Sequence, residues 1–301
     1  MESTPVNLLE LGKNEVQNFL DSFDHVFSDC DGVIWSKGPM PGASDFFNFM
    51  KKHGKTVNFV SNNSLRSRAN YEAQFKASGI DNGFVNLTIP SLAIAEYLKS
   101  VKFDKAVYCV TCSETISVLE AHGFKCKDGP DVAPDNYVEF LKFLEDDEEI
   151  GAVVFDSDFK VNLPKLYKAI TYLNRPDVLF INGATDRVVP LKPGCLALGT
   201  GVFTDMVIEE VGRRPIQLGK PGKSFGEFAM KRAGVTDPSR VLFIGDMIEQ
   251  DIGLGRAVGF KTLLVLTNST VEDMLGHKTI RPDFYADSLG DIAKFLNNTF
   301  S

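Results

Sequence analysis

Several residue types that mark other protein classes are scarce in this chain. Its 301 residues include one Trp and five Cys, and the Cys are odd in number and scattered along the sequence. That pattern argues against a disulfide framework and favours a reducing compartment, so we expect a cytoplasmic protein. The sequence has no apolar run long enough to span a membrane. Its first residues also lack the basic segment followed by an apolar one that is typical of a signal peptide.

Positive charge is scarce as well, because 32 Lys and Arg face 40 Asp and Glu and leave a formal net charge of −8. Such a charge argues against non-specific binding to nucleic acid or to an anionic membrane, so we expect neither as a partner. Hydrophobic residues make up 44% and charged residues 24%, as in ordinary globular proteins. The length allows two domains or one large one, and the 24 Phe predict a Phe-rich core.

The stretch 24–35, DHVFSDCDGVIW, is the most informative part of the sequence. A short apolar strand is followed at once by Asp29, Asp31 and Gly32. In open parallel sheets the carboxyl ends of the strands are where ligands bind, and two carboxylates placed there require a cation or a shared proton. The alternative is an acidic turn in which Asp29 or Asp31 caps the next element.

Three further apolar stretches, 56–60, 215–218 and 241–244, are each followed by polar residues of matching chemistry. These residues are Ser61, Asn62 and Asn63 after the first, Lys220 after the second, and Asp246 with Asp251 after the third. The Ser and Asn residues could instead cap a helix over 65–78, whose free N–H groups would also suit an anion. Lys220 could be an ordinary solvated lysine.

If these strands lie in one parallel sheet, their carboxyl ends bring acids, a hydroxyl, an amine and free amides to one edge. Carboxylates suit Mg²⁺, which keeps several waters and is completed by a substrate phosphate. The amine and the amides suit that phosphate. A carboxylate that faces such a phosphate can attack phosphorus and form an aspartyl-phosphate.

The rest of the chain predicts an α/β protein with an insertion. Helices are expected over 1–23, 42–54 and 90–100, and a separate alternation of strands and helices fills 101–201. We therefore predict a core built from 1–100 and 202–301, with a second α/β domain at 101–201 inserted into it. Cys109 and Cys112 form a C-x-x-C pair, which we interpret as buried thiols because no second pair completes a zinc site.

Five motifs in this order resemble those of the haloacid dehalogenase (HAD) superfamily of phosphatases. They are DCDGVIW (29–35), FVSNNS with RSR after it (59–68), GTG (199–201), GKP (219–221) and GDMIEQDI (245–252). The chain is most similar to the branch of p-nitrophenylphosphatases, phosphoglycolate phosphatases and pyridoxal phosphate phosphatases. The resemblance covers essentially the whole chain. It implies a three-layer Rossmann-type parallel sheet core with an inserted α/β cap, and a possible homodimer formed through the cap.

The resemblance also implies a role for each candidate site residue. Asp29 would be the nucleophile, and Asp31 would protonate the leaving oxygen and later deprotonate the hydrolytic water. Ser61 and the amides of Asn62 and Asn63 would bind the phosphoryl oxygens, and Lys220 would compensate the negative charge of Asp29 and the phosphate. Mg²⁺ would be bound by Asp246, the Asp29 carboxylate and the Asp31 carbonyl. Asp251 would support that metal site.

Departures from the family pattern bear on the substrate. Met247 stands where the family usually has Arg, Glu249 where it has Asp, and Val189 where the pyridoxal phosphate enzyme has a cap His. Arg187 could pair with a substrate carboxylate, or it could be a solvated cap residue. We therefore expect a Mg²⁺-dependent phosphomonoester hydrolase that acts on a small phosphorylated metabolite such as 2-phosphoglycolate. The alternatives are a phosphoprotein phosphatase, a pyridoxal phosphate phosphatase, and a non-catalytic binding protein that kept the fold.

Overall fold

The computed structural model describes residues 4–130, 134–192 and 195–300, and the chain divides into two compact units. Unit 1 consists of Met1–Ser61, Arg68–Thr88 and Lys220–Ser301, and unit 2 of Asn62–Ser67 and Ile89–Gly219. Both predicted domain boundaries, at 100/101 and 201/202, lie inside unit 2. Within the described part of the chain, none of the helices is long and apolar enough to cross a bilayer.

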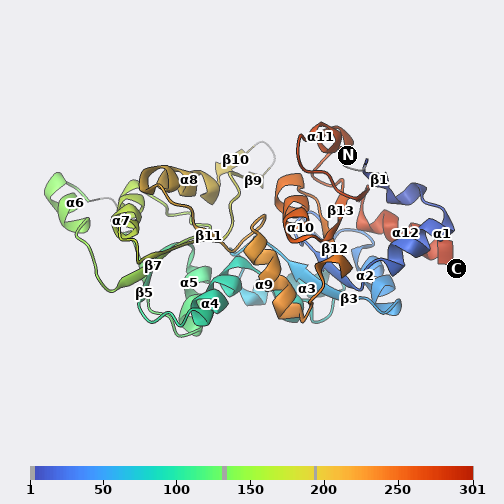
Figure 1. Ribbon diagram of the computed structural model, residues 1–301, viewed down its shortest axis with the longest axis horizontal. Helices are drawn as coiled ribbons and strands as arrows, with labels where there is room; N and C mark the ends of the chain where they lie inside the picture. Colours follow the sequence, from blue (N-terminus) through green and yellow to red (C-terminus); the bar gives the residue numbers. More distant parts are fainter. Residues whose placement is uncertain (1–3, 131–133, 193–194, 301) are drawn as a thin grey trace. The chain divides into compact units, whose positions relative to one another are not determined.

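Unit 1 is organised around a seven-stranded sheet in which every neighbouring pair is parallel (Figure 1). In sheet order the strands are β1 (Val6–Asn7), β14 (Phe284–Ala286), β13 (Lys261–Val265), β12 (Val241–Gly245), β2 (His25–Ser28), β3 (Thr56–Val60) and β4 (Leu87–Thr88). The central strands β12 and β2 are rich in fully buried residues, as expected for strands covered on both faces. Their register pairs Ser28 with Ile244, so the residues that follow each strand emerge side by side at one edge.

Helices cover both faces of this sheet. The chain moves outward from β2 through α2 to β3 and through α3 to β4, and in the opposite direction from β12 through α10 to β13. Right-handed crossovers in opposite directions place their helices on opposite faces. The helical segments of unit 1 are η1 (Leu8–Glu10), α1 (Lys13–Asp21), α2 (Ala43–Lys52), α3 (Arg68–Ala77), η2 (Gly83–Asn86), α9 (Lys223–Ala233), η3 (Pro238–Arg240), η4 (Ile248–Ile252), α10 (Gly253–Val258), α11 (Val271–Gly276) and α12 (Leu289–Phe300).

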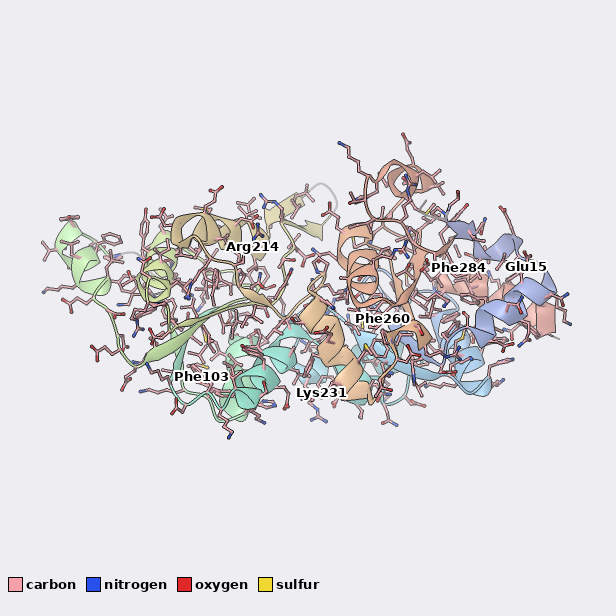
Figure 2. The ribbon with its side chains drawn as sticks, viewed as in Figure 1. Glu15, Phe103, Arg214, Lys231, Phe260 and Phe284 are labelled. Atoms are coloured by element: carbon pink, nitrogen blue, oxygen red, sulfur yellow. The ribbon has the colours of Figure 1, made fainter. Side chains whose placement is uncertain are left out.

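The core of unit 1 contains many aromatic rings, as the composition predicts. Phe260, which is labelled in Figure 2, contacts Phe27 of β2 edge-on and stacks with Phe243 of β12. Phe284, also labelled there, meets Phe19 of α1 with ring centroids 4.9 Å apart. These contacts tie the first and last quarters of the chain into one hydrophobic core.

Unit 2 has its own parallel sheet and a short hairpin. The five-stranded sheet has the order β11 (Ile216–Gln217), β8 (Leu179–Asn182), β7 (Ile150–Phe155), β5 (Ala106–Val110) and β6 (Cys126–Asp128). The hairpin pairs β9 (Val188–Lys192) with β10 (Cys195–Leu198) in antiparallel fashion. The helices are α4 (Pro90–Ser100), α5 (Ser113–Ala121), α6 (Tyr137–Phe143), α7 (Leu163–Leu173) and α8 (Thr200–Val211). Cys109 and Cys112 are buried free thiols, which confirms the interpretation of the C-x-x-C pair.

Two local predictions are wrong. The expected single helix over 1–23 is instead strand β1, the 3₁₀ turn η1 and helix α1. The side chain of Asn7 caps η1 by accepting a hydrogen bond from the N–H of Leu9, and β1 pairs with β14 at the far end of the sequence. The strand before Lys220 was expected in the core sheet, but β11 pairs with β8 in the sheet of unit 2. Lys220 itself belongs to unit 1.

Candidate active site

Asp29 follows β2 directly and is almost completely buried, with 5% of its surface exposed. Its N–H donates to the carbonyl of Ile244 at 2.8 Å, which continues the ladder between β2 and β12 by one residue. The side chain therefore leaves the sheet at a fixed point of the carboxyl edge. This is the position that the sequence predicts for an acid at the end of a buried parallel strand.

Lys220 bridges two of the buried acids. Its Nζ donates to Oδ1 of Asp29 and to Oδ1 of Asp251, in both cases at 2.6 Å, and only 3% of the residue is exposed. Lys220 is therefore a buried ion-pair residue, and the alternative of a solvated lysine is wrong. Burial alone would lower the pKa of Lys220, but the charges of Asp251 and Asp29 outweigh it and raise that pKa.

Asp251 sits on the π-helical turn η4, and both of its carboxylate oxygens have partners. While Oδ1 accepts from Lys220, Oδ2 accepts from the backbone N–H groups of Asp246 and Met247 at 3.1 and 3.0 Å. Gly245 leaves the room for this, because a Cβ there would lie 2.1 Å from Cβ of Asp251. Asp251 thus holds the end of β12 and the ammonium of Lys220 in place.

Asp246 is fully buried and has one engaged and one unengaged carboxylate oxygen. Oδ2 accepts from Nδ2 of Asn268 at 2.5 Å, and the backbone carbonyl accepts from Oγ of Ser269 at 2.6 Å. Oδ1 is buried and has no hydrogen-bond partner. A buried carboxylate oxygen without a donor is costly unless something else satisfies it.

Asp31 and Gly32 form the turn beyond Asp29. Gly32 has φ +83°, and a Cβ there would lie 1.9 Å from Oδ2 of Asp246, so the D-x-D-G pattern needs glycine both for the turn and for the space. The Gly32 carbonyl accepts from Oγ1 of Thr267 at 2.6 Å. Asp31 is half-buried, and its Oδ1 accepts from the indole Nε1 of Trp35 at 3.2 Å.

The polar residues after β3 do not lie at the start of a helix. Helix α3 begins at Arg68, so its N-cap position is Ser67 rather than Ser61, Asn62 or Asn63. Ser61 is buried in unit 1, where Oη of Tyr71 donates to its Oγ at 3.3 Å. Asn62 and Asn63 belong to unit 2. There, Nδ2 of Asn62 donates to Asp186 at 3.3 Å, and Oδ1 of Asn63 accepts from the N–H of Leu65.

The candidate substrate residue of unit 2 has a charged partner. Arg187, which is exposed, forms an ion pair with Asp205 of α8 through one guanidinium nitrogen. Val189 lies in strand β9, which begins directly after Arg187. A substrate carboxylate at Arg187 would have to compete with Asp205.

Among the residues that the structure describes, three acids of unit 1 are placed so that they could hold a metal ion. One carboxylate oxygen from each of Asp29, Asp246 and Asp251 lies within 4.8 Å of the others. One lysine against three carboxylates leaves an excess of two negative charges, which one divalent cation would neutralise. Burial, reinforced by the charge of Asp251, raises the pKa of Asp246 to about 7, and burial also raises the pKa of Asp29 well above its usual value. A bound cation would reverse this by favouring the ionised forms.

These residues fit Mg²⁺ in donor type and in number. The unpartnered Oδ1 of Asp246 and the carboxylate of Asp29 are hard oxygen donors, whereas both oxygens of Asp251 are already engaged. Mg²⁺ is usually bound by one or two protein carboxylates together with waters and a substrate phosphate. The fit therefore favours Asp29 and Asp246 as ligands, with Asp251 holding the surrounding groups.

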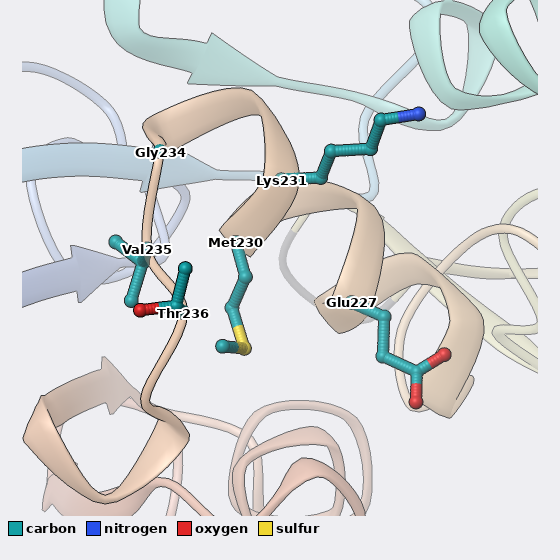
Figure 3. A pocket seen from close by; sticks show the side chains of 6 residues that line it. All are labelled: Glu227, Met230, Lys231, Gly234, Val235 and Thr236. Atoms are coloured by element: carbon teal, nitrogen blue, oxygen red, sulfur yellow. The ribbon is translucent and has the colours of Figure 1, made fainter.

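A separate hollow of about 370 Å³ lies in unit 1 at the end of α9 (Figure 3). Its lining consists of Glu227, Met230, Lys231, Gly234, Val235 and Thr236. None of the predicted site residues belongs to this lining. The hollow also brings no cluster of acids together, so the chemistry points to the edge of the sheet instead.

Comparison with known proteins agrees with this geometry. The sequence model of the haloacid dehalogenase-like hydrolase family matches residues 26–125, and a second family model, described as HAD-hydrolase-like, matches residues 217–292. The chain is 34% identical over 298 residues to phosphoglycolate phosphatase 2 of Arabidopsis thaliana, covering 96% of this chain and 98% of that protein. It belongs to the haloacid dehalogenase-like hydrolases.

Two further similarities place the chain within this family. It is 30% identical to the glycerol-3-phosphate phosphatase of Rattus norvegicus over 97% of this chain and 96% of that one. The p-nitrophenyl phosphatase from Archaeoglobus fulgidus superposes with a TM-score of 0.76 at 26% identity, covering 91% of this chain and 99% of that one. The predicted family, its phosphatase branch and the α/β fold with an inserted cap are confirmed, and the alternative of a non-catalytic protein is set aside.

Sequence reasoning missed the residues that hold the acids in place. Four of them, Trp35, Tyr71, Asn268 and Ser269, each hydrogen-bond a residue of the predicted site, and Thr267 hydrogen-bonds Gly32 next to Asp31. Trp35 lies inside the motif 29–35 and could have been suspected, because a buried indole N–H needs an acceptor. The polar run 267–270 was a further signal, since it comes soon after β13 as the other polar groups follow β2 and β12.

Proposed function

We propose that this protein is a Mg²⁺-dependent phosphomonoester hydrolase that works through an aspartyl-phosphate on Asp29. The observation that carries the proposal is the buried Asp29 carboxylate, which is paired with Lys220 at 2.6 Å and lies within 4.8 Å of a carboxylate oxygen of Asp246. Such a carboxylate is held in one orientation, so it can attack an electrophile without first losing a shell of water.

The chain's own residues divide the reaction between them. Asp29 attacks phosphorus, and the alcohol leaves with a proton from Asp31. Lys220 offsets the negative charge of Asp29 and of the phosphoryl oxygens, while Ser61 donates to one of those oxygens. In the second half, Asp31 takes a proton from the water that hydrolyses the acyl phosphate. Bound Mg²⁺ would supply positive charge where Asp29 and the phosphate meet.

The proposed substrate is a small phosphorylated acid such as 2-phosphoglycolate. The similarity to an enzyme named for that substrate supports this, and so does Arg187, whose guanidinium can exchange Asp205 for a substrate carboxylate. Pyridoxal 5′-phosphate is less favoured because Val189 offers its ring no polar contact. Glycerol 3-phosphate, which has no carboxylate, is the main competitor by similarity.

Unit 2 is proposed to serve as the cap that chooses the substrate, with Asn62 and Asn63 supplying amides to the phosphoryl group. We also infer a cytoplasmic enzyme, which the five free thiols support. A homodimer formed through unit 2 remains a prediction, and light scattering of the purified protein tests it.

The deciding experiment is a turnover assay against 2-phosphoglycolate, glycerol 3-phosphate, pyridoxal 5′-phosphate and p-nitrophenyl phosphate, with Mg²⁺ or with EDTA. We expect hydrolysis only with Mg²⁺ and the highest kcat/KM for 2-phosphoglycolate. Arg187→Ala should lower that value about tenfold and leave glycerol 3-phosphate unaffected, since only one of the two carries a carboxylate. Arg214→Ala, an exposed arginine elsewhere in unit 2, is the matched control. Full activity in EDTA would remove Mg²⁺ from the mechanism, and equal losses for both substrates would remove the role of Arg187.

A further inference from the structure

Trp35 is the single tryptophan of the chain, and a tight turn brings it back to Asp31. Within that turn, the N–H of Gly32 donates to the carbonyl of Trp35 at 2.7 Å, and the N–H of Ile34 donates to the carbonyl of Cys30 at 2.8 Å. The indole Nε1 then donates to Oδ1 of Asp31 at 3.2 Å. Four residues after the proposed acid–base group, the chain thus returns a hydrogen-bond donor to it.

The indole ring cannot easily turn away from this contact. Only 1% of Trp35 is exposed, and its ring meets Phe75 of α3 edge-on, with centroids 4.9 Å apart. Tyr71, one helical turn earlier on α3, lies near the same indole, with ring centroids 6.3 Å apart. A donor that is locked by packing imposes its own direction on the acceptor, because moving the ring would require repacking the core.

Asp31, by contrast, is only half-buried, and its carboxylate turns about single bonds. A hydrogen bond that fixes one oxygen also fixes the plane of the carboxylate, and therefore the direction of the second oxygen. A group that transfers a proton must keep such a direction, since small misplacements are expensive in rate.

We propose that Trp35 is a positioning residue, whose indole N–H orients the Asp31 carboxylate for proton transfer to the leaving group. This inference rests on the proposed function, in which Asp31 is the acid. The competing explanation is that Trp35 only fills the core and that Asp31 merely satisfies a buried donor. The two explanations differ in what removal of the N–H does to esters with different leaving groups.

The test compares kcat/KM of wild type and Trp35→Phe for p-nitrophenyl phosphate and for the alkyl ester that wild type hydrolyses best. This constant covers the steps up to departure of the alcohol, so it excludes hydrolysis of the aspartyl-phosphate. A good leaving group needs little protonation, whereas an alkoxide needs a well-placed acid. We expect the alkyl ester to lose about ten- to a hundredfold more than p-nitrophenyl phosphate. Equal losses for the two esters would overturn the proposal.

Tyr71→Phe is the matched control, because it removes another buried donor next to the same ring cluster. Its hydroxyl donates to Ser61, which is proposed to hold the phosphoryl group common to all substrates. Its loss should therefore lower kcat/KM for both esters by the same factor. If Tyr71→Phe separates the two esters as strongly as Trp35→Phe does, the effect belongs to general loosening of the cluster and the proposal fails.

A spectroscopic readout tests the contact without any turnover. Because the chain has one tryptophan, ¹⁵N-labelled protein gives one indole N–H cross-peak. We expect the ¹H chemical shift of this cross-peak to lie downfield of that of an indole N–H without a carboxylate acceptor. Asp31→Asn should move the shift upfield, since an amide oxygen is a weaker acceptor than a carboxylate. Asp45→Asn, an exposed acid of α2, should leave it in place. A peak that ignores Asp31→Asn overturns the positioning role even in an active enzyme, whereas wild-type protein without any phosphatase activity overturns the proposed function itself.

Discussion

Both units have a buried aspartate at the end of a parallel strand, but the two aspartates have different partners. In each, a buried parallel strand ends in a buried aspartate: Asp29 follows β2 in unit 1, and Asp156 follows β7 in unit 2. Asp156 accepts from the N–H of Ala184 at 3.1 Å and from Oγ1 of Thr115 at 3.2 Å, so neutral donors satisfy it. Asp29 is held by a lysine and lies among other acids. The position at the strand end makes the acid available, and its partners decide whether it can react.

The buried lysines repeat this contrast. Lys165 in unit 2 is completely buried and donates to Asp128 and Asp158 at 2.9 and 3.1 Å. Lys220 in unit 1 also contacts two aspartates, but a third acid, Asp246, lies beside that pair. In unit 2 one lysine meets two acids, an excess of one negative charge, whereas in unit 1 one lysine meets three acids, an excess of two.

The largest expected effect separates Asp29 from Asp156. Asp29→Asn should lower kcat at least about a thousandfold, because an amide is a far poorer nucleophile than a carboxylate. Its melting temperature should change little, since the substitution removes one charge from a cluster with excess negative charge. Asp156→Asn should do the reverse and lose about 1–3 kcal/mol of stability, because its NH₂ group would face either the Ala184 N–H, which cannot accept, or the Thr115 hydroxyl, which would have to stop donating. Assays of turnover and thermal unfolding on both variants check this, and an inactive, well-folded Asp156→Asn protein would contradict it.

A smaller effect should separate the two lysines. Lys165→Met and Lys220→Met each leave two acids without their cation, so each should lower the free energy of unfolding by about 2–4 kcal/mol without metal. Saturating Mg²⁺ should restore part of that loss in Lys220→Met, because the cation can take over charge compensation there. It should not do so in Lys165→Met. Thermal unfolding with and without Mg²⁺ measures the difference, and equal responses of the two variants would refute a metal site beside Lys220.

Much of the fold was predictable because its signals are local. The helix at Pro90–Ser100 begins with a proline at its first position, and the strands around Phe27 and Phe243 are short apolar runs followed by acids. The pairing of β1 with β14 was not predictable, because it joins residues almost a whole chain apart. The strand β11 was assigned to the wrong sheet for the same reason, since a two-residue strand carries no mark of its partner.

The candidate site divides in the same way. The acids at 29, 31 and 246 follow strands directly, so the sequence predicted where they would lie. Contacts that hold them, such as Asn268 on Asp246, depend on side chains that meet only after folding. The partner of Arg187 was equally hidden, because Asp205 lies on α8, beyond the hairpin of β9 and β10.

A further prediction concerns pH, and it again separates the two units. Burial raises the pKa of Asp246 to about 7 and also raises the pKa of Asp156, above a value near 4 in the unfolded chain. Between those values the folded protein binds more protons than the unfolded one, so stability falls as pH rises from about 4 towards 7. One such group contributes a slope of at most about 1.4 kcal/mol per pH unit.

Mg²⁺ should cancel only the part of this slope that comes from unit 1. Binding requires the ionised form of Asp246, so the metal releases its proton and stabilises the folded state more at pH 8 than at pH 5. Asp156 has neutral partners, and its share of the slope should persist with or without the metal. Thermal unfolding from pH 5 to 8, in EDTA and in Mg²⁺, measures both shares. Asp246→Asn should reduce the metal-sensitive share to what Asp29 contributes and leave the share of Asp156 unchanged, and a slope that ignores Mg²⁺ would separate Asp246 from the metal.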